Sequence, residues 1–507
     1  MGALMHHGLE RAAARLGPRD FVRAGDRSWS FRELDDLADG FAGRLATAGV
    51  HAGERVAVMM SNRVEFVIAV HAVSKLGAAS VLLSPAWKAA EVDHAVGLTR
   101  PVHAIADGTA VGLLRERIGG VTDVEDPPLV SIPAAGAPVT GDPAARGPVA
   151  DTDEAVLVFS SGTTGLPKAV RHTHRSIGHA TAHWCEVLDL GEDDRFQVAT
   201  PPSHILGLLN LLAAASAGAT VRLHARFDLE ELLRRVESER MTLEMAVAPI
   251  ALALANLANL EDYDLSSLRY IMWGATPVTE TVARTVTRRS GVRWLPAYGA
   301  SEVPVISCNP VRDPGAWRLD SAGLPPKGVE LRIADLDTGR ILDAGEVGEI
   351  QVRSPSRMAG YLPAEADRDA FVDNWYRTGD VGWLEPEGWV HLTDRSKEMI
   401  KVSGFQVAPA EIEAVLLGHP AVLDCAVFGL PDERAGELPV AAVQADPARP
   451  VSGAELQQLV ADSLARYKQL RHVVFVDAIP RLPSGKALRR QLRDEWVPEL
   501  AARGPDA

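Results

Sequence analysis

The chain has 507 residues, of which 47% are hydrophobic and 23% charged, so it can fill several large cores and a mainly disordered protein is excluded. Lys and Arg number 52 against 67 Asp and Glu, and the net charge of −15 argues against a protein that binds nucleic acid or an anionic membrane surface. Three widely spaced cysteines, none in a CxxC pair, argue against a disulfide framework and favour a reducing, cytoplasmic compartment.

Helical and strand periodicities alternate from the start of the chain. Helices are predicted over residues 30–49, 62–76 and 88–98, and strands over residues 55–60, 79–83 and 102–106. Ser30 and Glu33 have the spacing of a capping box at the first helix. Strands that alternate with helices predict a parallel sheet covered on both faces.

The middle of the chain continues this pattern after a break. Residues 133–151, rich in Ala, Pro and Gly, predict an irregular connection, and a second series of strands and helices runs from about residue 155 to 309. The longest apolar run, residues 205–221, is short for a bilayer and contains Asn210 and Ser216. We therefore expect a buried helix that leads into a strand, and no membrane span.

The pattern changes after Trp317. Residues 323–361 contain short alternating segments separated by glycine turns, which predict a small antiparallel, β-barrel-like subdomain. Beyond residue 394, helices at 409–417 and 453–468 and strands at 422–428, 440–444 and 473–476 predict an α+β unit. The expected fold is α/β, with stacked βα sheets and the subdomain in an N-terminal domain, residues 1–394, and a C-terminal domain, residues 395–507.

The segment FSSGTTGLPK, residues 159–168, directly follows an apolar run. Gly162 and Gly165 let backbone N–H groups approach an anion, and Lys168 adds a positive charge. Hydroxyl donors come from Ser160, Ser161, Thr163 and Thr164. This composition predicts a phosphate-binding loop, although the spacing differs from that of a P-loop.

Four further segments follow in order: YGASE at 298–302, YRTGD at 376–380, DRSKEMIKVSGFQVAPAEIE at 394–413, and PSGK at 483–486. With them the chain resembles, over essentially its whole length, the adenylate-forming superfamily of acyl- and aryl-CoA synthetases, luciferases and peptide-synthetase adenylation domains. The resemblance implies ATP, Mg²⁺, CoA and a small-molecule carboxylic acid: the carboxylate attacks the α-phosphate, pyrophosphate leaves, and a thiol then displaces AMP. Residues 404–413 resemble those of 4-coumarate-type ligases, which favours free CoA as the acceptor.

The resemblance also implies residue roles. Tyr298 is expected against adenine, Asp380 at the ribose hydroxyls with Arg395 as a second contact, and Glu302 at Mg²⁺, where Ser160 is a further metal ligand. Lys486 is expected to bridge the substrate carboxylate and the α-phosphate. The implied catalytic residues are Lys486, Glu302, Thr164 and His204. The remaining implied ATP contacts are Ser161, Gly162, Thr163, Thr164, Gly165, Lys168, Ala275, Thr276, Gly299 and Ser301.

In the family, the C-terminal domain rotates between the two half-reactions, which makes it a mobile unit. Lys397 aligns with the hinge. Rotation is expected to carry Lys486 out of the site and to bring Ser403 and Gly404 toward the thiol channel.

The expected acyl pocket is lined by His204, Trp273, Gly274, Ala297, Ala300 and Pro304. If the indole of Trp273 faces the pocket, it shortens the pocket and favours an aryl or a short- to medium-chain acid. His179 and His183 have the i,i+4 spacing of zinc ligands but lack an evident third ligand, so ordinary helix histidines are the preferred interpretation.

The sequence alone leaves several hypotheses open. The favoured one is an ATP- and Mg²⁺-dependent acid–CoA ligase. A second is an adenylating enzyme that serves a carrier protein or an amine, or that activates another small oxyanion such as nitrite. A third is a catalytically silent nucleotide-binding protein. The oligomeric state is open, with a homodimer as one option.

Overall fold

The computed structural model describes residues 4–126, 128–131, 149–160, 167–274, 279–395, 398–402, 405–432, 435–481 and 485–502. Several residues singled out from the sequence lie outside these ranges: Ser161, Gly162, Thr163, Thr164, Gly165, Ala275, Thr276, Lys397, Ser403 and Gly404. Most of the predicted irregular connection lies outside them too.

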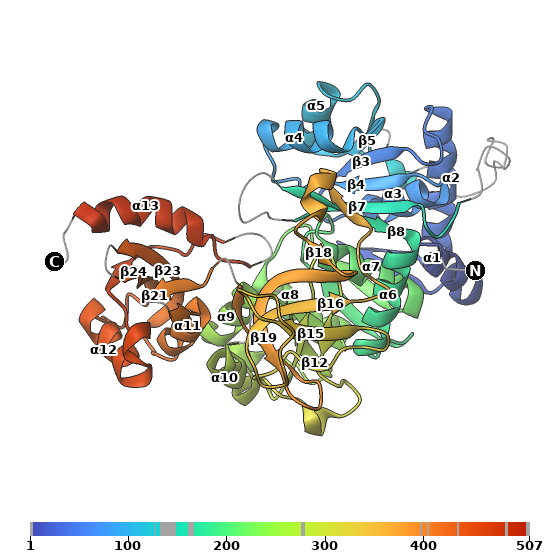
Figure 1. The fold of residues 1–507 in the computed structure, drawn as a ribbon. Coiled ribbons are helices and arrows are strands. Elements are labelled where there is room, and N and C mark those ends of the chain that lie inside the picture. Colours follow the sequence, from blue (N-terminus) through green and yellow to red (C-terminus); the bar gives the residue numbers. More distant parts are fainter. Residues whose placement is uncertain are drawn as a thin grey trace.

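A seven-stranded sheet forms the first layer of the N-terminal region (Figure 1). In sheet order its strands are β17 (Gly360–Leu362), β8 (Lys168–Thr173), β7 (Glu154–Ser160), β4 (Ala79–Leu82), β3 (Arg55–Met59), β5 (His103–Ala106) and β6 (Val121–Asp123). The strands from β7 to β6 are parallel, and β8 and β17 add an antiparallel edge. The predicted parallel sheet is confirmed in this part.

Helices cover both faces of this sheet. They are α2 (Phe31–Thr47) and α3 (Val64–Lys75) on one side and α4 (Ala89–Thr99) and α5 (Gly108–Arg115) on the other. The capping box at α2 is present, because Ser30 Oγ accepts from Glu33 N and the Glu33 carboxylate accepts from Ser30 N. Successive strand residues point to opposite faces, so Val56 and Val58 join one core and Ala57 and Met59 the other.

Two four-stranded sheets form the second layer. One has the order β2 (Arg27–Ser30), β1 (Asp20–Ala24), β10 (Thr220–Leu223) and β9 (Arg195–Val198), and the other β11 (Leu243–Ala246), β12 (Tyr270–Trp273), β13 (Trp294–Tyr298) and β14 (Ser307–Cys308). The accompanying helices are α1 (His7–Leu16), α6 (His174–Val187), α7 (Ile205–Ala217), α8 (Leu229–Glu239), α9 (Ala248–Asn256) and α10 (Glu280–Ser290).

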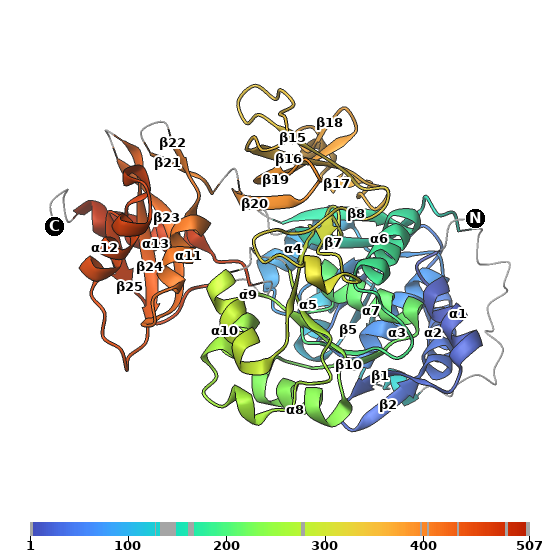
Figure 2. The same ribbon diagram turned by 90° about the horizontal axis from the view of Figure 1, so that it is seen from below.

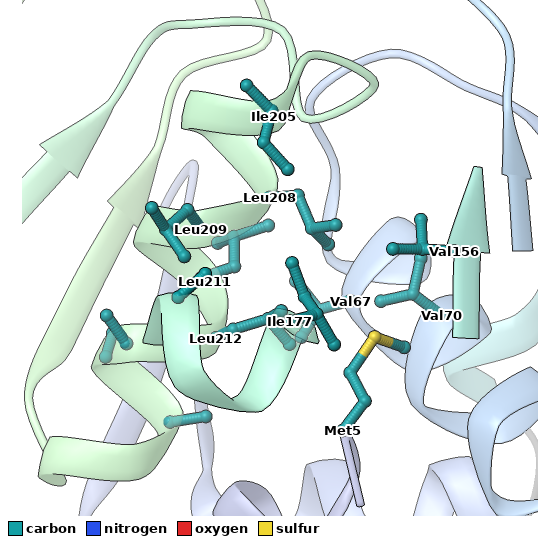
Figure 3. Close-up of a cluster of buried hydrophobic side chains, with 14 of the residues drawn as sticks. Met5, Val67, Val70, Val156, Ile177, Ile205, Leu208, Leu209, Leu211 and Leu212 are labelled. Carbon is teal, nitrogen blue, oxygen red and sulfur yellow. The ribbon is translucent and has the colours of Figure 1, made fainter. Parts of the chain in front are cut away.

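Helix α7 is the buried helix that the apolar run predicts, and β10 follows it. Its leucines lie in a cluster with Ile177 of α6, Val67 and Val70 of α3, Val156 of β7 and Met5 (Figure 3). This cluster joins the two layers. In the described ranges no helix has the length and apolarity needed to cross a membrane.

A five-stranded antiparallel sheet forms the small subdomain. Its strands are β15 (Glu330–Ala334), β16 (Gly348–Arg353), β19 (Trp375–Leu384) and β18 (Phe371–Val372), with β20 (Val390–Arg395) on β19. Strand β17 leaves this region to pair with β8, so the subdomain is tied to the first sheet (Figure 2).

The C-terminal region is built on its own sheet with its own apolar cores. The strands are β22 (Phe405–Val407), β21 (Ile400–Val402), β24 (Gly436–Ala445), β23 (Val422–Asp432) and β25 (His472–Phe475), and the helices are α11 (Pro409–Leu417), α12 (Gly453–Ser463) and α13 (Arg489–Ala502). This unit, orange to red in Figure 1, meets the rest of the molecule where α11 lies beside α10. The predicted boundary after residue 394 falls inside β20, whose last residue Arg395 still pairs with Asp380.

Candidate active site

The segment predicted to bind phosphate connects β7 to β8. Its described flanks are Ser160 at the end of β7 and Lys168 at the start of β8, which are cross-strand neighbours. The ammonium of Lys168 lies 5.0 Å from the centroid of the Tyr361 ring on β17. A cation over an aromatic face is held without losing its charge, so Lys168 can act at an anion near this edge of the sheet.

Tyr298 and Asp380 are 82 residues apart in sequence and in contact in the fold. The Tyr298 hydroxyl at the end of β13 donates to Asp380 Oδ2 at 2.5 Å, and Arg395 Nε on β20 lies 3.0 Å from Asp380 Oδ1. The Asp380 carboxylate raises the pKa of Arg395 above its usual value, although burial acts in the opposite direction. Burial, and then the charge of Asp380, raise the pKa of Tyr298, so the phenol stays protonated as a donor.

Glu302 lies on the loop that follows β13 and is 93% buried, since only 7% of it is exposed. Its Oε1 accepts a hydrogen bond from the Tyr361 hydroxyl at 2.6 Å, and the Tyr361 and Tyr376 hydroxyls are 3.4 Å apart. One oxygen of a carboxylate can accept this bond while the second faces a metal ion, so Glu302 is suited to Mg²⁺.

A buried histidine positions this loop. His172 on β8 donates from Nε2 to the Ser301 carbonyl at 2.7 Å, while its Nδ1 lies 3.1 Å from Ser176 Oγ. Burial lowers the pKa of His172 to about 4, so it is neutral at physiological pH. A neutral ring with one N–H and one acceptor nitrogen matches these two partners.

The backbone of Pro304 lies so close to residue 299 that only glycine fits at this position. A Cβ atom at this position would lie 2.1 Å from the Pro304 carbonyl oxygen, which is far inside van der Waals contact. Glycine therefore allows residues 299–304 to fold tightly against the end of β13.

Lys486 of the C-terminal region reaches the same place. Its Nζ lies 2.6 Å from Glu398 Oε1, and Arg489 bonds the other oxygen of that carboxylate. Burial and then the nearby charge of Arg395 lower the pKa of Lys486. The backbone beside it is close to the N-terminal region, because a Cβ at Gly485 would lie 2.7 Å from Pro249 Cδ at the start of α9.

A cavity of about 190 Å³ lies between the two regions and gathers these groups. Tyr298, Asp380, Arg395, Glu398 and Lys486 all line it. The predicted nucleotide contacts Tyr298, Asp380, Arg395 and Lys486, which come from four separate sequence segments, therefore meet around one space.

A second cavity of about 70 Å³ lies on the other side of Tyr298, toward α7. Its described lining residues are Trp184, His204, Ile205, Leu206, Leu209, Met272, Gly274, Ala297, Tyr298, Gly299, Ala300, Ser301 and Pro304. All the expected acyl-pocket residues except Trp273 are among them. Ala297, Tyr298 and Gly299 line both cavities, so the two spaces share a wall.

Trp273 requires a correction. Trp273 is 1% exposed, its ring packs at a tilt of 57° against that of Trp294 with 5.0 Å between the centroids, and it lines the cavity beside Lys486. Met272 and Gly274 line the smaller cavity instead. Consecutive residues of a strand point to opposite faces, so Trp273 does not shorten this cavity, and Met272 takes the place we expected for it.

His204 is the N-cap of α7 and lines the smaller cavity. Its Nδ1 accepts a hydrogen bond from Leu206 N at 3.5 Å, and burial lowers its pKa. The ring is therefore neutral, with its Nε2 proton available to a group in the cavity.

The structure does not favour the zinc interpretation of His179 and His183. His183 Nε2 is bonded to the Lys327 carbonyl at 3.1 Å, and the two rings are 6.3 Å apart between centroids.

Reasoning from sequence missed several of these residues. His172 contacts Ser301, Tyr361 contacts Glu302, and Tyr376 lies beside Tyr361. Glu398 contacts Lys486. Only contacts between segments that are distant in sequence reveal these four residues. Two of them could have been suspected from the sequence, because Tyr376 is the first residue of the YRTGD motif and Glu398 lies in the motif at residues 394–413. Met272 could have been predicted from the alternation of side chains along β12, and Trp184 from the apolar face of α6.

Comparisons with known proteins agree with this geometry. The family model described as AMP-binding enzyme matches residues 9–362, and that of the AMP-binding enzyme C-terminal domain matches residues 411–486. A 4-coumarate–CoA ligase 5 from Oryza sativa subsp. japonica is 35% identical over 93% of this chain and 90% of its own length.

Two solved structures extend the comparison. The O-succinylbenzoate coenzyme A synthetase from Bacillus subtilis, in complex with ATP and magnesium ion, has a TM-score of 0.84 and 29% identity over 96% of this chain and 99% of that one. An amide bond synthetase from Marinactinospora thermotolerans has a TM-score of 0.85 and 28% identity over 97% of this chain and 99% of that one. The family matches and the identity along nearly the whole chain show that this protein belongs to the AMP-binding enzyme family.

Proposed function

We propose that this protein is an ATP- and Mg²⁺-dependent ligase that joins a small, uncharged carboxylic acid to CoA through an acyl-adenylate. One observation carries the proposal. The cavity lined by Tyr298, Asp380 and Lys486 shares a wall with the apolar cavity beside His204, so a nucleotide in the first and an acyl group in the second would meet at Tyr298 and Gly299.

In the first half-reaction the chain binds the nucleotide at both ends. Asp380, oriented by Tyr298 and Arg395, has the acceptor oxygens for two ribose hydroxyls. Lys168 supplies positive charge beside the β7–β8 connection. Glu302 and Ser160 would hold Mg²⁺, which when bound neutralises phosphate charge and favours a fixed phosphate geometry.

Lys486 then acts at the reacting atoms. Carboxylate and α-phosphate repel one another, and an ammonium between them lowers the energy of the charge that develops during attack. In the present arrangement Glu398 holds this ammonium at the cavity, so the substrate anions would replace Glu398 as its partner. Pyrophosphate leaves as the carboxylate oxygen bonds to phosphorus.

In the second half-reaction the C-terminal domain rotates about the segment near Lys397. Rotation removes Lys486 and brings the segment around Ser403 and Gly404 toward the thiol of CoA. The thiolate attacks the acyl carbon, and AMP leaves with the electron pair of the broken C–O bond. The neutral ring of His204, which lines the acyl cavity, would donate a hydrogen bond from Nε2 to the carbonyl oxygen, where negative charge develops.

The acyl cavity supports a small, uncharged substrate. None of its described lining residues is an acid, a lysine or an arginine, and most are aliphatic or glycine. A second carboxylate or an ammonium would be desolvated there without a partner. We therefore favour aryl and short acids, and we place the reaction in the cytoplasm because three unpaired cysteines suit a reducing compartment.

A panel of acids tests the proposal. With ATP, Mg²⁺ and CoA, the accepted acid should give AMP, pyrophosphate and an acyl-thioester in equal amounts. Pyrophosphate release with no thioester would remove the CoA step, and an absence of pyrophosphate release with every acid would contradict the whole proposal.

An amine acceptor is the second candidate, because an amide bond synthetase shares the fold and 28% of the sequence. The same reaction with CoA and an amine in competition separates the two candidates. Thioester as the main product supports the ligase, and amide as the main product supports the alternative.

A further inference from the structure

Tyr361 on β17 contacts two residues that the proposed function places at the triphosphate. Its hydroxyl donates to Glu302 Oε1 at 2.6 Å, and the ammonium of Lys168 lies 5.0 Å from the centroid of its ring. Tyr361 itself is buried, with 6% of the residue exposed. One side chain therefore joins the proposed metal ligand to the proposed phosphate lysine, although the two are far apart in the sequence.

The register of β17 on β8 explains the contact with Lys168 (Figure 2). In this antiparallel pair Tyr361 is opposite Val170 and Leu362 is opposite Ala169. Lys168 precedes Val170 by two residues, so its side chain leaves the same face of the sheet as that of Tyr361 and is its diagonal neighbour. A shift of the pairing by one residue would turn Tyr361 to the other face, so the contact depends on this register.

The same segment holds Glu302 by its main chain and by its side chain. Met358 N donates to the Glu302 carbonyl at 2.8 Å, while the Tyr361 hydroxyl donates to the carboxylate. Among the described residues, only Tyr361 donates a hydrogen bond to this carboxylate. A phenol has one proton, so the Tyr376 hydroxyl, 3.4 Å away, can only donate to the Tyr361 oxygen. The carboxylate thus has one oriented oxygen and one that can face a cation.

We propose that Tyr361 is a positioning residue of the ATP site: its hydroxyl orients the Glu302 carboxylate for Mg²⁺, and its ring holds the Lys168 ammonium for the phosphates. The inference rests on the proposed function and adds a residue that acts through these two. A carboxylate that binds a metal ion is usually oriented by a hydrogen bond, and the loss of such a partner costs about 10–100-fold in metal affinity. The ring face attracts the ammonium without neutralising its charge.

Nucleotide binding without the reaction tests this proposal. The full-length protein is titrated with α,β-methylene-ATP, which cannot be cleaved between its α- and β-phosphorus atoms, once in EDTA and once in saturating Mg²⁺. The Kd in EDTA measures the contacts that need no metal, among them Lys168. The ratio of the Kd in EDTA to the Kd in Mg²⁺ measures the coupling between metal and nucleotide. We expect a wild-type ratio of about 10 or more, and a ratio near 1 in Glu302→Gln.

Two variants separate the hydroxyl from the ring. Tyr361→Phe keeps the ring, so the ratio should fall about 10-fold, to near 1, while the Kd in EDTA stays within about 2-fold of the wild-type value. Tyr361→Leu removes both groups, so the ratio should fall equally and the Kd in EDTA should rise by about 3-fold or more. Tyr270→Phe is the matched control: Tyr270 is also buried, but its hydroxyl donates to the Leu188 carbonyl at 2.5 Å and it lines neither cavity, so both quantities should keep their wild-type values.

Rescue by Mg²⁺ gives a second readout. Pyrophosphate release by Tyr361→Phe should need about 10-fold more Mg²⁺ for its half-maximal rate, and its kcat should return to the wild-type value when Mg²⁺ is saturating. A packing defect alone would lower kcat at every Mg²⁺ concentration and would contradict the inference.

The binding data can overturn each part of the proposal. A wild-type ratio in Tyr361→Phe, together with a ratio near 1 in Glu302→Gln, would show that the hydroxyl does not act on the metal site. A wild-type Kd in EDTA for Tyr361→Leu would remove the role of the ring; if that variant does not fold, Tyr361→Met takes its place. A wild-type ratio of 1 would overturn the metal role of Glu302 and this inference with it.

The ligase proposal and this inference fail separately. The titrations contain neither acid nor CoA, so a panel in which no acid gives a thioester removes the ligase proposal and leaves the binding ratios to decide on Tyr361. A working ligase whose ratio is unchanged in Tyr361→Phe removes only the inference.

Discussion

Lys486 forms an ion pair with Glu398 in this structure, and this pair compensates the buried ammonium at the cavity while no substrate is bound. Burial and Arg395 lower its pKa, whereas the Glu398 carboxylate raises it. The role that we propose for it, electrostatic stabilisation of the charge that develops during adenylation, requires the protonated form, so the rate should depend on the balance of those influences.

Replacement of Lys486 should separate the two half-reactions. We expect Lys486→Ala to slow acyl-adenylate formation by about 10²–10³-fold, the range seen when a charge-stabilising donor is removed, and to slow thioester formation from supplied acyl-AMP much less. Single-turnover assays of each half-reaction measure this. An equal loss in both would contradict the domain rotation.

The pH dependence of adenylation tests the Glu398 contact. The kcat/KM of adenylation, which reports the free enzyme in which Glu398 still pairs with Lys486, should fall as pH rises through the pKa of Lys486, because the ammonium is lost. In Glu398→Gln the carboxylate no longer favours the charged form, so this pKa falls further and the alkaline limb of the pH–rate profile should move to lower pH by about 1 unit. Pyrophosphate exchange between pH 6 and 10 measures the limb. A shift to higher pH, or none, would show that Glu398 does not control Lys486.

At this scale, the sequence motifs singled out several residues that the fold brings together, but they did not predict how those residues pair. Tyr298, Asp380 and Glu302 were predicted from their motifs, yet the Tyr298–Asp380 and Glu302–Tyr361 hydrogen bonds join segments that no local pattern relates. Trp273 was misplaced because Gly274 and Trp273 were both assigned to one pocket, although side chains alternate along a strand.

Among the structural elements, the tight turn after β13 controls the geometry of both cavities. Its residues Tyr298 and Gly299 line each of them, and the Pro304 carbonyl lies against Gly299. A displacement of this turn would therefore change the shape of both cavities, the one proposed for the nucleotide and the one proposed for the acyl group.

Gly299→Ala should therefore damage catalysis. The added Cβ would lie 2.1 Å from the Pro304 oxygen, so the turn must move, and we expect kcat/KM for both ATP and the acid to fall by at least about 10-fold. The control is Gly97→Ala in α4, where nothing lies within 4 Å of the added Cβ and a helix favours Ala over Gly. Wild-type kinetics in Gly299→Ala would show that the turn has room to adjust.

Asp394 joins β20 to α11, since its Oδ2 accepts a hydrogen bond from Ala410 N at 3.0 Å. Burial raises its pKa to about 6, above the usual 3.8, despite the nearby Arg489. The folded protein thus binds this proton more tightly than the unfolded chain, and the ionised group costs stability above pH 6.

Asn can accept only one of the two backbone hydrogen bonds, from Arg395 N and Ala410 N, that the Asp394 carboxylate accepts, which is a loss independent of pH. Relative to wild type, Asp394→Asn should therefore gain about 1–3 kcal/mol of stability between about pH 4, where the unfolded carboxyl is also protonated, and pH 8. Tm values of variant and wild type across this range measure the effect. A gain that grows toward acid pH would contradict the raised pKa.

Local elements were largely predictable. The capping box at Ser30, the apolar helix α7 and the alternation of helices and strands all follow from residue spacing. The register that brings β17 back to β8 does not, because it depends on a strand contributed from nearly 200 residues further along the chain.

The whole molecule places its chemistry between two units with separate cores. The N-terminal region supplies Tyr298 and Asp380 to the cavity between them, and the C-terminal region supplies Lys486, next to Gly485, whose backbone lies close to α9. Two units were predicted from the change in pattern, but the place where they meet, with α11 beside α10, required the fold (Figure 2).

A crystal structure with ATP and Mg²⁺ tests the account most directly. We expect the nucleotide in the cavity between the two regions, with the ribose at Asp380, the base against Tyr298 and the α-phosphate within reach of Lys486. A nucleotide bound away from these three residues would contradict the account.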